Sequence, residues 1–158
     1  MKDKLIERIR AVGHWRINLR PLRPLDERLS FRQCQEVVEQ NRVSIRGWDY
    51  PHISYRQDEQ GALERGDQFV ESWCDWNEQL EFWRMYRSGQ FLSYNALSED
   101  FLHGVQGRPR AGPFLDVVDA IYSVTEFIEF AFRLFASGTH ADGSQLDLSL
   151  HGSGGRAL

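Results

Sequence analysis

Residues 67–96 carry the pattern that most constrains the fold of this chain. Eight aromatic side chains lie between Phe69 and Tyr94, and apolar and polar residues alternate there with the period of two that β-strands produce. The pattern predicts three consecutive antiparallel strands that form the centre of a sheet. The predicted strands span about 68–76, 79–87 and 90–96.

The turns that join these strands decide which side chains share a face of the sheet. A two-residue turn at Ser88-Gly89 suits glycine, which tolerates a positive φ. It would pair Tyr86 with Phe91, Arg84 with Ser93 and Phe82 with Asn95 on one face, and leave Trp83, Met85, Leu92 and Tyr94 on the other. A second turn at Asn77-Glu78 would add Phe69, Glu71 and Trp73 to the first face.

The remaining periodicities predict an α+β fold with a mostly antiparallel sheet of five or six strands. Ser30 and Gln33 form a capping box before an amphipathic helix at about 30–40, and a long apolar helix follows at about 114–136, with Pro113 in its first turn. Further elements are predicted as a helix at 3–12, strands at 14–20, 43–46 and 145–151, and an exposed loop at 56–67. We expect a single domain over 1–151 and a flexible glycine-rich tail over 152–158.

Composition and charge restrict the classes of function. The formal net charge of −4 argues against general attraction to nucleic acid or to anionic lipid. However, residues 1–56 hold 12 basic and 7 acidic side chains, a net of +5, so the rest of the chain carries −9. The two charge sets either pair within one domain or leave a basic patch. No run of apolar residues is long enough for a membrane span, and Cys34 and Cys74 suit reduced core thiols in a cytoplasmic protein.

The first candidate binding surface is the mixed face of the predicted meander, formed by Phe82, Arg84, Tyr86 and Phe91. Aromatic rings supply contact area at a small entropic cost, and arginine supplies directed hydrogen bonds. The alternative is that the N-terminal helices cover this face and leave Glu71 and Arg84 as an ordinary cross-strand pair.

The second candidate surface is the turn that follows Gly47. Arg46, Trp48, Asp49, Tyr50 and His52 place a cation, two large rings, a carboxylate and an imidazole in one short segment. Loops that present such groups often bind ligands. The alternative is structural, with Trp48 and Tyr50 fixing the loop to the sheet and Asp49 bonding to its own turn.

Two other classes of function stay open. A nucleic-acid-binding surface could combine Arg16, Arg20, Arg23, Arg42 and Arg46 with Trp15 and Trp48. A small hydrolase or metal-dependent enzyme could use Asp49 with His52, or the carboxylates of the long helix at Asp116, Asp119, Glu126 and Glu129. The glycine-containing segment 104–112 lacks the ending of a phosphate-binding P-loop.

No catalytic, metal or nucleotide motif occurs in the sequence, so we expect no cofactor. The favoured interpretation is a non-catalytic binding or interaction module that acts through the aromatic sheet face or the Gly47–His52 turn. Its partner is expected to be a protein or a second copy of the chain, because the long helix offers a wider apolar arc than one sheet face can cover.

Overall fold

The computed structural model describes residues 2–76, 79–101 and 114–158. The elements are α1 (Lys2–Arg10), β1 (His14–Pro21), α2 (Phe31–Asn41), β2 (Val43–Ser44), β3 (Asp49–Tyr50), β4 (Gly61–Arg65), β5 (Phe69–Trp76), β6 (Gln79–Tyr86), β7 (Phe91–Ala96), the 3-10 helix η1 (Ser98–Asp100), α3 (Val117–Ala136) and β8 (Ser144–His151). The predicted α+β class is confirmed.

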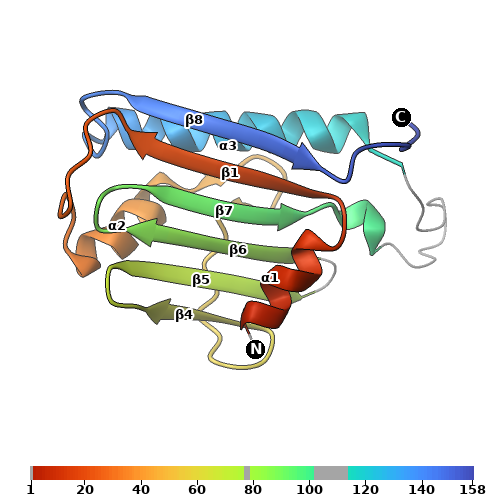
Figure 1. Cartoon of the computed structure of the whole chain (residues 1–158), viewed down its shortest axis with the longest axis horizontal. Coiled ribbons are helices and arrows are strands. Elements are labelled where there is room, and N and C mark those ends of the chain that lie inside the picture. The colour runs from red at the N-terminus through yellow and green to blue at the C-terminus, as the bar shows by residue number, and fades with distance from the viewer. Residues whose placement is uncertain (1, 77–78, 102–113) are drawn as a thin grey trace.

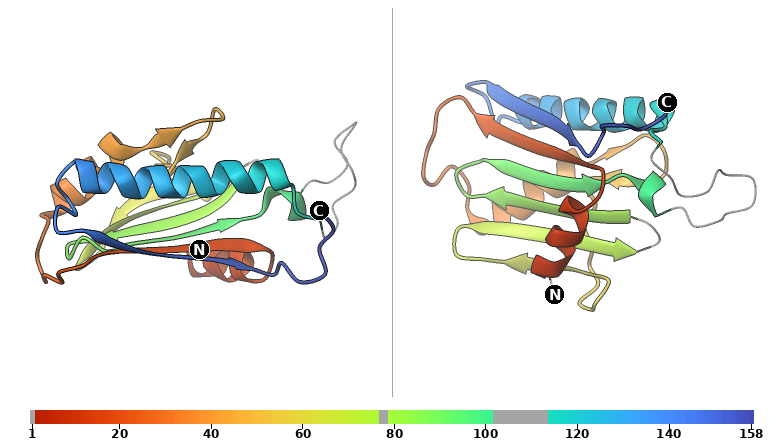
Figure 2. Two further views of the ribbon diagram at one scale, coloured as in Figure 1. Left: turned by 90° about the horizontal axis from the view of Figure 1, so that it is seen from above. Right: turned by 45° about the vertical axis from the view of Figure 1, so that its right-hand side comes forward.

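A six-stranded antiparallel sheet organises the molecule, in the order β4-β5-β6-β7-β1-β8 (Figure 1). Strand β1 lies between β7 and β8, so the N-terminal strand pairs with the last strand of the chain. Helices α2 and α3 and the small β2–β3 hairpin cover one face, and α1 crosses the other (Figure 2). The α1 face is only partly covered, because α1 lies over β5, β6 and β7 and leaves the outer side of β1 and β8 open.

The register of β6 and β7 corrects the predicted meander. Residues 87–89 form a three-residue loop, closed by hydrogen bonds from Tyr86 N–H to Gln90 O (2.8 Å) and from Gly89 N–H to Tyr86 O (2.9 Å). Gly89 has φ of +87°, which only glycine adopts without strain. The extra loop residue shifts the pairing by one, so Phe91 lies opposite Met85 and packs in the core with it. The prediction that Phe91 shares a face with Phe82, Arg84 and Tyr86 was wrong.

Two hydrophobic cores lie on opposite sides of the sheet. The larger one packs β1, β6 and β7 against α2 and α3, with Trp83, Phe91 and Phe130 fully buried. The smaller one lies beneath α1, where Leu5 and Ile9 contact Phe82 and its neighbours. A sheet with apolar side chains on both faces needs a cover on each side, which is why the short α1 is part of the fold.

The helix ends follow local capping rules. Ser30 and Gln33 form the predicted capping box at the start of α2. The long helix begins later than predicted, at Val117, because the Asp116 side chain accepts hydrogen bonds from the N–H groups of Val118 and Asp119. Pro113 lies outside the described residues, as do the predicted turn at 77–78 and the segment 104–112.

Two segments predicted to be loop or tail make defined contacts. The second half of the predicted loop at 56–67 is strand β4, in which Gly61 lets the chain pass close to Ser54 and to the Trp73 carbonyl. In the segment 152–158, the Arg156 side chain bonds to Asp100 and to the Gly152 and Phe114 carbonyls. The predicted strand at 43–46 is shorter, because only Val43 and Ser44 pair, with β3.

Both cysteines are buried free thiols, and burial raises the pKa of Cys34 to about 11 and of Cys74 to about 12. Neither is therefore an activated nucleophile. In the described part of the chain, no helix combines the length and apolarity needed to cross a bilayer.

The corrected register predicts unequal costs for two adjacent truncations. Phe91→Ala should reduce the free energy of unfolding by about 4 kcal/mol, because it empties a fully buried site. Leu92→Ala, on the half-covered α1 face, should cost about 1 kcal/mol. Urea denaturation of the two variants measures the difference. A larger loss of unfolding free energy for Leu92→Ala would contradict the three-residue loop and favour the two-residue turn.

Candidate functional site

A cleft of about 360 Å³ opens between α3, the β2–β3 hairpin and the adjoining ends of β1, β6 and β7. We call it the inner cleft. Its lining combines aromatic rings with polar and charged groups, namely Trp15, Arg46, Trp48, Tyr50, Gln79, Glu81, Asn95, Ala96, Leu97, Ser98, Glu99, Asp119, Ala120, Ser123, Glu126 and Phe127. Its size and mixed lining are those of a small-molecule site.

Arg46 forms one wall of the inner cleft by reaching from the β2–β3 hairpin to α3. Its guanidinium donates to Glu126 (2.9 and 3.3 Å) and to the Ser123 hydroxyl (2.9 Å), and it lies 3.4 Å from Asp119. These acceptors follow one another along the polar stripe of α3. The stripe therefore has a partner within the chain, and the arginine holds the hairpin against the helix.

Trp48 and Glu81 form the opposite wall. The Trp48 indole N–H donates to the Glu81 carboxylate (2.8 Å), and the ring stacks on His52 with centroids 4.1 Å apart. Glu81 is 7% exposed, and this burial raises its pKa to about 7. Hydrogen bonds from the Trp48 indole and from the backbone N–H of His52 act in the opposite direction. Glu81 is therefore close to half ionised at neutral pH.

Carboxylates outnumber cations around the inner cleft. Four carboxylates line it, namely Glu81, Glu99, Asp119 and Glu126. Arg46 is the only arginine or lysine among its described lining residues. Burial also raises the pKa of Glu126, although the Arg46 hydrogen bond and charge act in the opposite direction. The cleft thus has an excess of negative charge above neutral pH, and this favours a positively charged occupant.

Tyr50 contributes a buried hydroxyl without a partner among the described residues. Its ring packs edge-on against Phe127 (4.8 Å) and Phe130 (5.7 Å), and burial raises its pKa. The neighbouring Ser93 hydroxyl acts in the opposite direction on this pKa and donates its own hydrogen to Asn95 (2.5 Å). Because a buried hydroxyl without a partner is costly, this group is available to a ligand in the cleft.

No protein-family model, curated protein or solved structure matches this chain.

The structure brings together most of the predicted turn residues. Arg46, Trp48 and Tyr50 all line the inner cleft. Asp49 instead pairs with Arg42 (2.8 Å), and His52 stacks on Trp48 at the edge. Burial lowers the pKa of His52, with the Asp49 charge acting in the opposite direction.

The predicted sheet-face residues lie elsewhere. Phe82 is buried beneath α1, and Arg84 forms a cross-strand ion pair with Glu71 (2.6 Å), which Lys2 of α1 also contacts. Tyr86 lies half-buried next to them, whereas Phe91 is on the opposite face. The arrangement matches the alternative in which an N-terminal helix covers this face.

The other predicted constellations are separated in space. Arg16 opens onto the α1 side of β1, whereas Arg42 and Arg46 lie on the α3 side and pair with carboxylates. Within residues 2–76, 79–101 and 114–158, no group of three histidine, cysteine or acidic side chains is placed to hold a metal.

Sequence reasoning missed Glu81 and Glu99. Glu81 lies in an aromatic strand on the same side as Trp83 and Met85, so a carboxylate at a core position was the available signal. Glu99 accepts from the Asp116 N–H (2.9 Å) in η1, and no periodicity marks such a residue.

The raised pKa of Glu81 predicts a pH-dependent stability. The folded state holds the Glu81 proton more tightly than the unfolded chain does. Protonated Glu81 therefore adds to the free energy of unfolding in full below pH 4.5, and this addition is lost as the pH rises to about 7. Glu81→Gln should therefore gain about 3 kcal/mol over the parent between about pH 4 and pH 8. Denaturant unfolding across this range measures the gain. Glu129→Gln, at a half-exposed ion pair with Arg133, is the control, and equal pH profiles for both variants would contradict the assignment.

Proposed function

We propose that this protein is a non-catalytic binding module whose inner cleft binds a small ligand bearing a protonated amino group. The observation that carries the proposal is the unpartnered Tyr50 hydroxyl in a cleft that also holds the buried Glu81. An ammonium group supplies a positive charge for Glu81 and a hydrogen-bond donor for the Tyr50 hydroxyl.

The aromatic lining supports the same class of ligand. Trp15, Trp48, Tyr50 and Phe127 contribute ring surfaces around the acidic groups. Aromatic faces attract cations through their quadrupoles, and the attraction increases when the cation is desolvated. A primary amine with a short alkyl chain thus satisfies the charge, the hydroxyl and the apolar walls together.

Binding of putrescine tests this proposal. Calorimetry at about pH 8, where Glu81 is ionised, should show that putrescine binds. The uncharged diol of the same chain length should not bind. Glu81→Gln keeps the side-chain shape and should weaken binding by roughly tenfold, because it removes the charge. Lowering the pH to about 6 should weaken binding to the parent protein by protonating Glu81.

The control for this experiment is Glu129→Gln, which removes a carboxylate from α3 outside the inner cleft. It should leave the putrescine affinity within about twofold of the parent. Equal binding of the amine and the diol, or equal effects of the two variants, would contradict a cation site.

The outer side of α3 favours self-association of the chain as a second property. Seven large apolar residues of this helix are exposed, namely Val117, Val118, Ile121, Tyr122, Ile128, Phe132 and Phe135. Five of them, with Thr125, follow the alternating spacing of three and four residues from Val118 to Phe135 that pairs helices in coiled coils. We propose that a second copy of this chain covers this stripe.

The stripe is self-complementary when two copies run antiparallel. The smaller Val118 and Ile121 of one copy then meet the larger Phe135 and Phe132 of the other, so bulk is matched along the seam. All seven residues are at least 39% exposed, so a second copy would bury them in an interface of the usual size of ~800 Å² per partner. Antiparallel helix dipoles also attract each other.

Light scattering coupled to size exclusion tests the self-association. At about 100 µM the parent should elute as a dimer, and Phe132→Glu should convert it to a monomer by placing charge in the seam. Leu22→Glu is the matched control, because Leu22 is 60% exposed against 61% for Phe132 but belongs to the segment after β1 and not to the α3 stripe. A monomeric parent, or dimers of Phe132→Glu, would contradict the proposed interface.

A further inference from the structure

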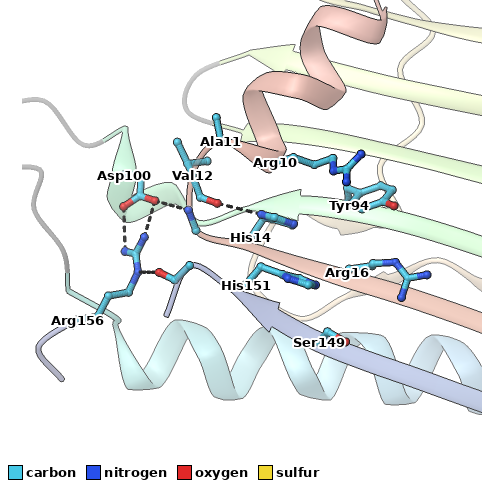
Figure 3. Close-up of a pocket in the computed structure, with 12 residues that line it drawn as sticks. Arg10, Ala11, Val12, His14, Arg16, Tyr94, Asp100, Ser149, His151 and Arg156 are labelled. Carbon is cyan, nitrogen blue, oxygen red and sulfur yellow. Dashed lines mark hydrogen bonds and ion pairs between the residues drawn. The ribbon is translucent and has the colours of Figure 1, made fainter. Parts of the chain in front are cut away.

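A second hollow of about 750 Å³ lies on the α1 side of the sheet, where α1 leaves β1 and β8 open. We call it the outer groove. Figure 3 shows its walls: Arg10 at the end of α1, Tyr94 of β7, His14 and Arg16 of β1, and Ser149 and His151 of β8. The antiparallel pairing places His14 beside His151 and Arg16 between Tyr94 and Ser149.

The charge of the outer groove is positive. Arg156 is neutralised by Asp100 (2.6 Å), which also accepts from the Gly13 N–H (2.7 Å). Arg10 and Arg16, in contrast, have no carboxylate within 4 Å among the described residues. Two free guanidinium groups thus face one hollow, whereas most arginines described elsewhere in the chain have an acidic partner.

The histidines add hydrogen-bonding groups between these arginines. The His14 Nδ1–H donates to the Val12 carbonyl (2.9 Å), and this leaves Nε2 without a partner in the described chain. The ring is 6% exposed and stacks on His151 with centroids 4.8 Å apart. Burial lowers the pKa of His14, and the charges of His151 and Arg10 lower it further.

We propose that the outer groove binds a phosphate group, held by Arg10 and Arg16 and by hydrogen bonds from the Ser149 hydroxyl and from the Nε2–H that His14 acquires on protonation. Phosphate carries two negative charges and accepts several hydrogen bonds at once, which matches a ring of cationic and neutral donors. The volume leaves room for the molecule that carries the phosphate. The site is independent of the inner cleft, which lies on the opposite face.

The groups that face His14 determine how binding depends on pH. They are Arg10 from α1, Arg16 from its own strand, Tyr94 from β7, His151 from β8 and the Asp100–Arg156 pair beside η1. Burial lowers the pKa of His14, so its ring is neutral in the free protein at neutral pH, and protonating it adds a positive charge and an N–H donor at Nε2. Bound phosphate should therefore raise the pKa of His14.

Nuclear magnetic resonance of the histidine rings tests the site with inorganic phosphate as the probe. Addition of phosphate at constant ionic strength should shift the His14 and His151 signals and raise the pKa of His14. Arg16→Gln should weaken phosphate binding about tenfold. Arg20→Gln is the matched control, because Arg20 lies on the same face of β1 but pairs with Asp147 (3.0 Å) outside the groove, and its affinity should stay within about twofold of the parent.

Two further binding experiments identify the kind of molecule that carries the phosphate. A nucleoside monophosphate that binds more tightly than its nucleoside supports a small phosphorylated ligand. A single-stranded RNA without terminal phosphates, bound with the same dependence on Arg16, supports a nucleic-acid backbone as the source. The proposal is overturned if chloride shifts the histidine signals as phosphate does, if no signal moves, or if Arg16→Gln and Arg20→Gln behave alike.

Discussion

The register of β6 and β7, set by the loop at 87–89, is the constraint on which the rest of the structure depends. It places Trp83, Met85 and Phe91 together on the α3 side and leaves Arg84 and Tyr86 on the α1 side. A slip of one residue would turn β7 over relative to β6, so Phe91 would leave the core and Leu92 would take its place. Glu81 lies on the α3 side as well, because it is two residues from Trp83 along β6.

The two hollows have opposite charge and lie on opposite faces of one sheet. Acidic groups from β6, η1 and α3 surround the inner cleft, and basic groups from α1 and β1 surround the outer groove. The net charge of −4 conceals this separation. Consecutive residues of η1 contribute to both, since Glu99 lines the cleft and Asp100 lines the groove, and a single turn of chain therefore forms part of each wall.

Local patterns in the sequence predicted much of the fold. Alternation over 69–96 indicated three strands, and the Ser30–Gln33 box indicated the start of α2, because each pattern reflects contacts between near neighbours. The register was mispredicted because two- and three-residue turns both accommodate Ser88 and Gly89. Strand β4 was missed because its exposed polar residues hide a buried Gly61 and Ala62.

The sites were less predictable than the fold, because each depends on contacts between distant residues. The turn at 46–52 was selected by its residue types alone, and three of its members line the inner cleft. The meeting of Arg46 with Glu126 joins residues 80 positions apart, and no local pattern reports it. The outer groove depends on the pairing of β1 with β8, which sets His14 beside His151.

That same pairing governs the order in which the molecule can be completed during synthesis. Strand β1 is synthesised before both of its partners, β7 and β8, and β8 ends at residue 151. The apolar side of β1 must therefore wait, without its final neighbours, while most of the chain is made. Non-local pairing of this kind slows folding and leaves strand edges open to other chains until the sheet is complete.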